Sequence, residues 1–147
     1  MCEKSPIPTP VLVVVVDSHG AVVGWPLVIP GEPTLLALPL HKTRRTLALI
    51  REKKAFSINF VRDAERAFEI FGKPGEDKLS KWGAASKCKT LPCNTLGDAS
   101  RVVECLYEGE VEVGEHVLVF CQVKAAYGCG DYAVWDPCTI NRQRQAE

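Results

Sequence analysis

The sequence predicts a mainly β domain, in which an antiparallel sheet or barrel carries two or three attached helices. Residues 101–113 and 116–127 are long strand-like runs joined by Gly114 and Glu115, the clearest hairpin signal in the chain. Residues 131–135 add a last strand, and helical spacing of apolar residues is confined to three segments. The predicted order is three strands, a helix, a strand, two helices, a loop and three strands.

Length and charge limit the classes of function. A chain of 147 residues suits one domain, which we take as 1–147 with a polar C-terminal tail over about 136–147. The 18 basic and 18 acidic side chains balance, so we expect no nucleic-acid partner. The first ten residues lack the apolar stretch of a signal peptide, and the longest apolar run, Pro10–Val16, is too short for a bilayer. We therefore expect a cytoplasmic protein with no membrane partner.

The first strands form a predicted hairpin. Val11–Val16 is a run of mostly β-branched residues, which predicts a strand covered on both faces. Ala21–Ile29 is its second arm, in which Gly24 and Pro26 interrupt the ladder and mark an edge, a bulge or a place of close approach. A ligand lying against this backbone and a plain bulged edge strand both fit the pattern. Thr34–Leu40 is the third strand.

The helix that follows has an unexpected charge at its start. It is predicted from about Thr43, a plausible N-cap, with an apolar stripe over Leu47–Ile50. Arg44 and Arg45 occupy its first turn, where unpaired N–H groups and the helix dipole favour acids. Either a bound anion such as a phosphate offsets these charges, or both guanidiniums extend into water at a cost of about 0.3–1 kcal/mol each.

The middle of the chain alternates short elements. Residues 56–61 predict a half-buried strand with Asn59 on its less apolar side. Asn59 would hydrogen-bond either a neighbouring loop or a ligand, and the loop is favoured. Asp63 caps a second helix, and Glu76–Trp82 forms a short third helix. Residues 83–100 show little periodicity and are predicted to be a long loop.

Catalytic and metal-ligating patterns are sparse. His19, His41 and His116 have no neighbour at metal-ligand spacing, so we expect no metal site. No residue stands out as catalytic. The pair Glu110 and Glu112 shares one face of a strand, which usually marks the solvated side.

The cysteines leave two interpretations. Cys88 and Cys93 form either a loop disulfide or two unrelated thiols, and a reducing cytosol favours the thiols. Cys105 and Cys121 lie within predicted strands and are interpreted as small core residues.

Four stretches carry a family resemblance: TPVLVVVV with its hairpin, KTRRTLALI followed by FSINFV, FGKPGEDKL, and VECLYEGEVEVGEHVLVFCQV. In this order and spacing they resemble the flavin reductase-like, FMN-binding split-barrel family. The resemblance implies a six-stranded antiparallel split barrel of Greek-key type with two or three attached helices. It also implies a homodimer in which FMN lies in a groove completed by the partner subunit.

The resemblance also implies site residues. The flavin phosphate would be bound by the turn and helix start, His41, Lys42, Thr43, Arg44, Arg45 and Thr46. The isoalloxazine ring would lie along Gly24, Trp25, Pro26, Leu27 and Val28, with Lys78 reaching the flavin as well. The family's second strand usually carries Asn, Ser and Thr at the polar edge of the flavin, whereas this chain reads GWPLVIPG. Backbone groups and Trp25 would take their place.

The function implied by this resemblance is that of an FMN-binding, NAD(P)H-dependent flavin reductase-like oxidoreductase. FMN, or FAD in its place, would take hydride from NADH or NADPH and pass electrons to free flavin or to an electron-acceptor protein. Two alternatives remain. One is a non-catalytic FMN-holding electron carrier or flavin-binding module, and the other is a split-barrel dimer that has lost flavin.

Overall fold

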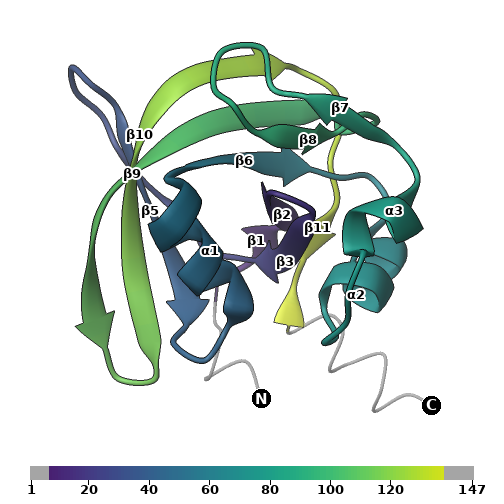
Figure 1. Cartoon of the computed structure of the whole chain (residues 1–147), viewed down its shortest axis with the longest axis horizontal. Helices are drawn as coiled ribbons and strands as arrows, with labels where there is room; N and C mark the ends of the chain where they lie inside the picture. Colours follow the sequence, from purple (N-terminus) through teal and green to yellow (C-terminus); the bar gives the residue numbers. More distant parts are fainter. Residues whose placement is uncertain (1–6, 138–147) are drawn as a thin grey trace.

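The computed structural model describes residues 7–137, in which one large antiparallel sheet carries three helices (Figure 1). The strands are β1 (Thr9–Pro10), β2 (Leu12–Val16), β3 (His19–Val23), β4 (Leu27–Ile29), β5 (Leu35–His41), β6 (Ala55–Phe60), β7 (Ala85–Lys87), β8 (Asn94–Leu96), β9 (Arg101–Val113), β10 (His116–Gly128) and β11 (Val134–Trp135). The helices are α1 (Arg45–Lys53), α2 (Ala64–Phe71) and α3 (Lys78–Trp82). No helix within residues 7–137 has the length and apolar character needed to cross a membrane.

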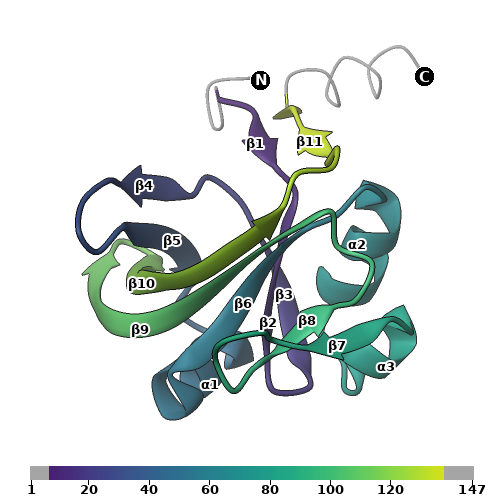
Figure 2. The same cartoon turned by 90° about the horizontal axis from the view of Figure 1, so that it is seen from above.

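The main sheet confirms the predicted class, a mainly β antiparallel split barrel. Its strand order is β3-β2-β6-β9-β10-β5-β4, and β1–β11 and β7–β8 form two small additional sheets. Seen from above, β9 and β10 curve away from β2 and β3, while α2 and α3 lie on the far side of β3 from α1 (Figure 2). The main sheet has seven strands rather than the six expected, because one predicted strand is divided in two.

That divided strand is the predicted hairpin arm 21–29. β3 pairs with β2, whereas β4 pairs with β5 at the opposite edge of the sheet. Between them Trp25 has a φ of 51°, in the left-handed region that a bulky residue adopts only when its surroundings hold it there. Gly24 and Pro26 therefore mark a crossing between two sheet edges and not an interruption within one strand.

β2 is buried on both faces, as its run of valines predicts. Because side chains alternate along a strand, Val14 packs into the core that contains Ile50 of α1, and Val13 packs into the core that contains Phe71 of α2. The hairpin of β9 and β10 also forms as predicted, with Gly114 in its turn.

β6 is buried on both faces and not half-buried as predicted. Asn59 tolerates this because its amide is satisfied: Nδ2 donates to the Val13 carbonyl at 3.0 Å, and Oδ1 accepts from the Leu96 N–H at 3.0 Å. Asn59 thus bonds strand residues of β2 and β8 and not a loop, although Leu96 belongs to the segment 83–100 that was predicted to be a loop.

Residues 83–100 are not a plain loop. They contain the β7–β8 hairpin, whose three-residue strands are too short to show alternation, and a disulfide that joins Cys88 to Cys93. A second disulfide joins Cys105 to Cys121 between β9 and β10, where both residues are fully buried. The preference for free thiols at 88 and 93 is therefore wrong, because it rested on the expected compartment and not on local geometry.

The boundaries of the later elements differ slightly from the prediction. Asp63 caps α2 as expected, its Oδ1 accepting from the Arg66 N–H at 3.1 Å. α3 begins at Lys78, two residues late, because Asp77 has a φ of 52°. β11 is shorter than the predicted last strand. Residues 138–147, most of the predicted tail, lie outside the described residues.

Candidate functional site

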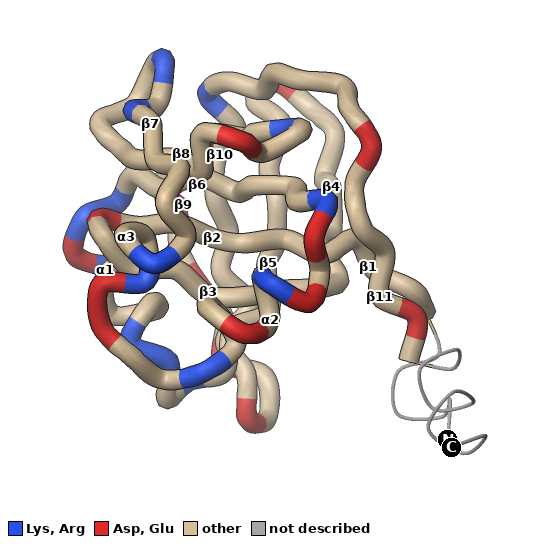
Figure 3. Tube along the Cα trace, turned by 90° about the vertical axis from the view of Figure 1, so that its right-hand side faces the viewer, with Lys and Arg blue, Asp and Glu red and all other residues tan. Residues whose placement is uncertain are grey.

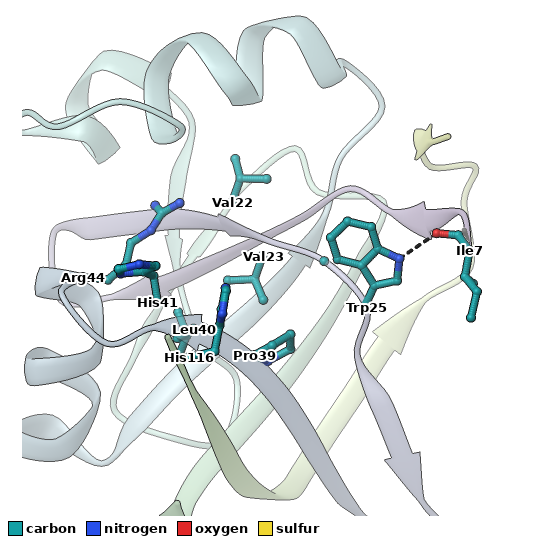
Figure 4. A pocket seen from close by; sticks show the side chains of 10 residues that line it. Ile7, Val22, Val23, Trp25, Pro39, Leu40, His41, Arg44 and His116 are labelled. Carbon is teal, nitrogen blue, oxygen red and sulfur yellow. Dashed lines mark hydrogen bonds between the residues drawn. The ribbon is translucent and has the colours of Figure 1, made fainter. Parts of the chain in front are cut away.

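Two adjoining cavities lie where the β2–β3 turn, the start of α1 and the beginning of β10 meet. The first, here called the cationic pocket, has a volume of about 700 Å³ and is lined by His19, Gly20, His41, Thr43, Arg44, Arg45, Thr46, Gly72, Lys73, Pro74, Gly75, Glu76, Lys78 and His116. The second, here called the Trp25 pocket, measures about 510 Å³ and is lined by Ile7, Val22, Val23, Gly24, Trp25, Pro39, Leu40, His41, Arg44 and His116 (Figure 4). The pockets adjoin because three of these residues line both.

The start of α1 is electropositive and uncapped. Arg44 is the N-cap residue, with extended backbone and no side-chain capping bond, and the first turn holds Arg45 and no acid. Thr43, the predicted cap, instead lies with its Oγ1 2.8 Å from His41 Nδ1, and the N-cap is one residue later, at Arg44. Open N–H groups and two guanidiniums thus concentrate positive charge at one end of the cationic pocket.

Arg44 and Arg45 form no ion pair with any carboxylate of residues 7–137. The ion pairs in this part of the chain join Lys42 to Glu112, Arg51 to Glu110, and Arg66 to Asp98. The chain has 18 basic and 18 acidic side chains, and in the view of Figure 3 positions of both signs are spread along the trace. The excess of positive charge at the start of α1 is therefore local to this site.

Lys78 brings a further cation to the cationic pocket from α3, beside Arg44, Arg45 and Lys73. Its side chain is buried, and its Nζ donates to the Gly20 carbonyl at 3.4 Å. Burial, followed by the charges of Arg44 and Lys81, lowers the pKa of Lys78 below its ordinary value. A bound anion would oppose both effects and favour the charged ammonium.

Two histidines meet at the boundary of the pockets. His41 at the end of β5 pairs with His116 at the start of β10, and their rings lie 5.5 Å apart at an interplanar angle of 73°. The Thr43 N–H donates to His41 Nδ1 at 3.3 Å. Because a backbone N–H can only donate, neutral His41 carries its proton on Nε2, which remains available as a donor.

Trp25 closes the end of the Trp25 pocket opposite Arg44 (Figure 4). Its backbone N–H donates to Thr9 Oγ1 at 2.6 Å, and its indole N–H donates to the Ile7 carbonyl at 2.6 Å. Its ring also contacts Trp135, with the centroids 5.4 Å apart. A Cβ on Gly24 would lie 3.0 Å from Thr9 Cγ2, so the close approach expected at this glycine is made by Thr9.

The structure brings together most, but not all, of the predicted site residues. Pro26, Leu27, Val28 and Lys42 line neither pocket. The residues that do line one are Gly24, Trp25, His41, Thr43, Arg44, Arg45, Thr46 and Lys78. Sequence reasoning missed His116, although its position directly after the hairpin turn places it at a strand start. No sequence prediction assigned Gly72–Gly75 to the site either, and this segment forms a wall of the cationic pocket.

One further cluster within residues 7–137 has donors at metal-ligand distances, namely Cys88, Cys93 and Glu104. The two cysteines form a disulfide, and both Glu104 oxygens accept hydrogen bonds, from the loop N–H groups and from Tyr127. In this state the cluster offers no free ligand to a metal ion.

Comparison with known proteins places the fold. The chain matches the family model described as "Flavin reductase like domain" over residues 4–137. No curated protein matches it significantly. One similar solved structure is the flavin reductase component of a bacterial two-component tryptophan halogenase, with a TM-score of 0.80, 15% identity, and coverage of 90% of this chain and 89% of that one.

Two other structures have the same fold. The styrene monooxygenase flavin reductase from Pseudomonas putida S12 has a TM-score of 0.73 and 20% identity, covering 88% of this chain and 87% of that one. The FMN-binding protein from Thermus thermophilus with bound p-hydroxybenzaldehyde has a TM-score of 0.78 and 16% identity, covering 90% and 83%. At such identities the likeness concerns the fold and not the activity.

Proposed function

Because the chain belongs to the flavin reductase like domain family, we propose that it binds FMN and acts as an NAD(P)H-dependent flavin reductase. One observation carries the proposal. The uncapped start of α1, Arg44, Arg45 and the buried Lys78 converge on one pocket, and no carboxylate of residues 7–137 pairs with these cations. Such a site fits the terminal phosphate of FMN, a compact dianion.

In this proposal each of the two pockets binds one part of FMN. The phosphate occupies the cationic pocket, where each hydrogen bond to a charged group contributes about 1.5–3 kcal/mol. The isoalloxazine ring occupies the Trp25 pocket, whose walls include Val22, Val23 and Leu40. Arg44 lines both pockets and so lies where the two parts of the ligand meet.

Bound FMN would supply the hydride and electron chemistry. The chain's own residues bind and orient. Trp25, fixed by Thr9 and Ile7, closes the ring pocket against water, and His41 presents its Nε2–H as a donor toward a polar ligand atom. Electrons would then pass to free flavin or to an acceptor protein. The halogenase relative is named as the flavin reductase component of a two-component system.

The proposed function is tested by flavin titration followed by anaerobic addition of NADH or NADPH. We expect the purified chain to bind FMN at least about 10²-fold more tightly than riboflavin, because only FMN brings the phosphate. We also expect a nicotinamide to bleach the visible flavin absorption. The titration is followed by flavin fluorescence and the bleaching by absorbance.

The outcomes separate the alternatives. Equal affinity for FMN and riboflavin would contradict the phosphate site, and tighter binding of FAD would identify the dinucleotide as the cofactor. FMN binding without bleaching by either nicotinamide would favour an electron carrier or a flavin-binding module. Failure to bind any flavin would favour a split barrel that has lost its cofactor.

We further propose that a second copy of the chain covers the apolar surface around Trp25, here called the Trp25 face and made of Ile7, Trp25, Leu27, Val28 and Val134. Four of these side chains are between 56% and 63% exposed, and β4 is an edge strand with one free side. An apolar surface beside a free strand edge is typical of an interface. Trp25 belongs both to this face and to the ring pocket, so a homodimer would complete the flavin site.

Val28→Lys is expected to convert the proposed dimer into a monomer, because it places a charge on the free edge strand β4 within the apolar contact. Sedimentation velocity measures the change, and FMN titration is expected to show weaker binding by the monomer. Val111→Lys is the matched control, since Val111 is 52% exposed on β9, is paired with Leu118 and lines neither pocket. A monomeric wild type, or a V28K variant that stays dimeric, would refute this interface.

A further inference from the structure

Two acids on β9 hold the segment that carries the arginines of the cationic pocket. Glu110 and Glu112 are two residues apart on a strand and so point to the same face. Glu110 contacts Arg51 near the C-terminal end of α1, and Glu112 contacts Lys42, three residues before α1 begins. Glu112 remains 67% exposed, as the sequence predicts, whereas Glu110 is only 24% exposed and is paired with α1.

The Glu110 contact is a bidentate ion pair. Arg51 Nε donates to Glu110 Oε1 at 2.7 Å, and Arg51 Nη2 donates to Oε2 at 2.5 Å. The Tyr107 hydroxyl donates to Oε1 at 2.7 Å, which fixes the carboxylate from its own strand. The Arg51 and Tyr107 hydrogen bonds lower the pKa of Glu110 to about 2, so it is ionised at neutral pH. Two parallel bonds fix an angle as well as a distance.

The Glu112 contact is weaker. Lys42 Nζ lies 3.0 Å from Glu112 Oε1, but both side chains are largely exposed, and exposed lysine pairs contribute little. The backbone already holds this end of the segment, since the Lys42 N–H donates to the Glu115 carbonyl at 3.1 Å. At the other end the Tyr107 N–H donates to the Lys54 carbonyl at 2.8 Å, and Glu110 adds to this backbone bond the stronger of the two side-chain contacts.

The length of α1 makes its orientation important for the pocket. Nine residues rising about 1.5 Å each give a rod of roughly 13 Å, so a tilt of about 5° about its C-terminal end moves its start by about 1 Å. A displacement of about 1 Å is enough to weaken oriented contacts substantially. The core side chains Leu47 and Ile50 hold the helix against the sheet, and the Arg51 fork fixes its direction.

We propose that Glu110 is a positioning residue for the flavin phosphate: by holding Arg51 it directs the start of α1, with Arg44 and Arg45, at the cationic pocket. Glu110 also pairs with Arg51, which leaves Arg44 and Arg45, at the start of α1, to bind the anion. This inference rests on the proposed FMN binding.

The test compares FMN and riboflavin binding by wild type and by Glu110→Gln. We expect E110Q to raise the Kd for FMN by about 5–10-fold and to leave the Kd for riboflavin within about twofold, because only the phosphate contacts the start of α1. Glu108→Gln is the matched control, since Glu108 lies on the same strand but bonds Gln122. It should change neither Kd, and Glu112→Gln should change the Kd for FMN by less than about twofold.

A double-mutant cycle with Arg51→Gln keeps the test independent of general destabilisation. If Glu110 acts through Arg51, the double variant binds FMN no more weakly than either single variant. Equal weakening of FMN and riboflavin would show a merely structural role and overturn the inference. A wild type that does not prefer FMN refutes the phosphate site itself, whereas a preference that E110Q retains refutes only the role of Glu110.

Discussion

Replacing Arg44 and Arg45 together by alanine is expected to weaken FMN binding by about 10²-fold or more and to change riboflavin binding by less than about threefold. Each arginine offers the phosphate a charge-assisted contact of about 1.5–3 kcal/mol, and 1.4 kcal/mol corresponds to a tenfold change in Kd. Neither side chain has a carboxylate partner within residues 7–137, so the substitution leaves no acid unpaired there. Fluorescence titration with both flavins measures the effect.

The double substitution Lys53→Ala with Lys87→Ala is its matched control. It removes the same charge from residues that line a different cavity, beside the Cys88–Cys93 disulfide. The control should bind FMN like wild type if local contacts matter, and like the arginine variant if only net charge matters. A uniform loss of affinity for FMN and riboflavin in the arginine variant would refute the phosphate site.

Glu104→Ala is expected to destabilise the fold by about 3–5 kcal/mol, because it leaves four hydrogen-bond donors without the acceptor they share. Glu104 on β9 is fully buried. Its carboxylate accepts the N–H groups of Lys89, Thr90 and Leu91 at 2.7, 2.9 and 2.7 Å, and the Tyr127 hydroxyl at 2.8 Å. It therefore fixes the loop closed by the Cys88–Cys93 disulfide to the main sheet. Urea unfolding measures the loss.

The Glu104 carboxylate should also make the stability of the fold depend on pH in the acid range. Burial raises the pKa of Glu104, but the Leu91, Tyr127, Thr90 and Lys89 hydrogen bonds lower it, and the net shift is downward. A group whose pKa is lower in the folded state stabilises the fold above its unfolded pKa, and this contribution is lost as pH falls. Together with Glu110, whose pKa is about 2, this predicts a loss of stability between about pH 4.5 and 2.

The pH series supplies the control for this prediction. Glu104→Ala should show a shallower loss over that acid window than wild type, and Glu108→Gln should match wild type, because Glu108 bonds only Gln122 among the described residues. A Glu104→Ala variant that is as stable as wild type would mean that water replaces the carboxylate at the loop N–H groups.

Local signals predicted the parts of the fold that depend on neighbouring residues. The valine run of β2, the Asp63 cap and the turn at Gly114 each rest on chemistry within a few positions. Arg44 and Arg45 stood out for the same reason, since a helix start with two bases and no acid is visible in the sequence alone.

The remaining features depend on strand pairing over long separations. His116 joins the site only because β10 pairs with β5, and the Arg51–Glu110 contact spans 59 positions. Lys78 reaches Gly20 across 58 positions, although the family resemblance had selected it. No local pattern encodes such registers, which is why Glu110 was assigned to solvent and the 21–29 arm to one strand.

The crossing at residues 24–26 has a mechanical consequence. The first and last strands in the order of the main sheet, β3 and β4, are consecutive in the chain. The four residue steps from Val23 to Leu27 can span at most about 14 Å. The end of β3 and the start of β4 therefore cannot lie farther apart than this. A flat ligand that binds beside Trp25 must therefore fit between β3 and β4, which are joined by only a short length of backbone.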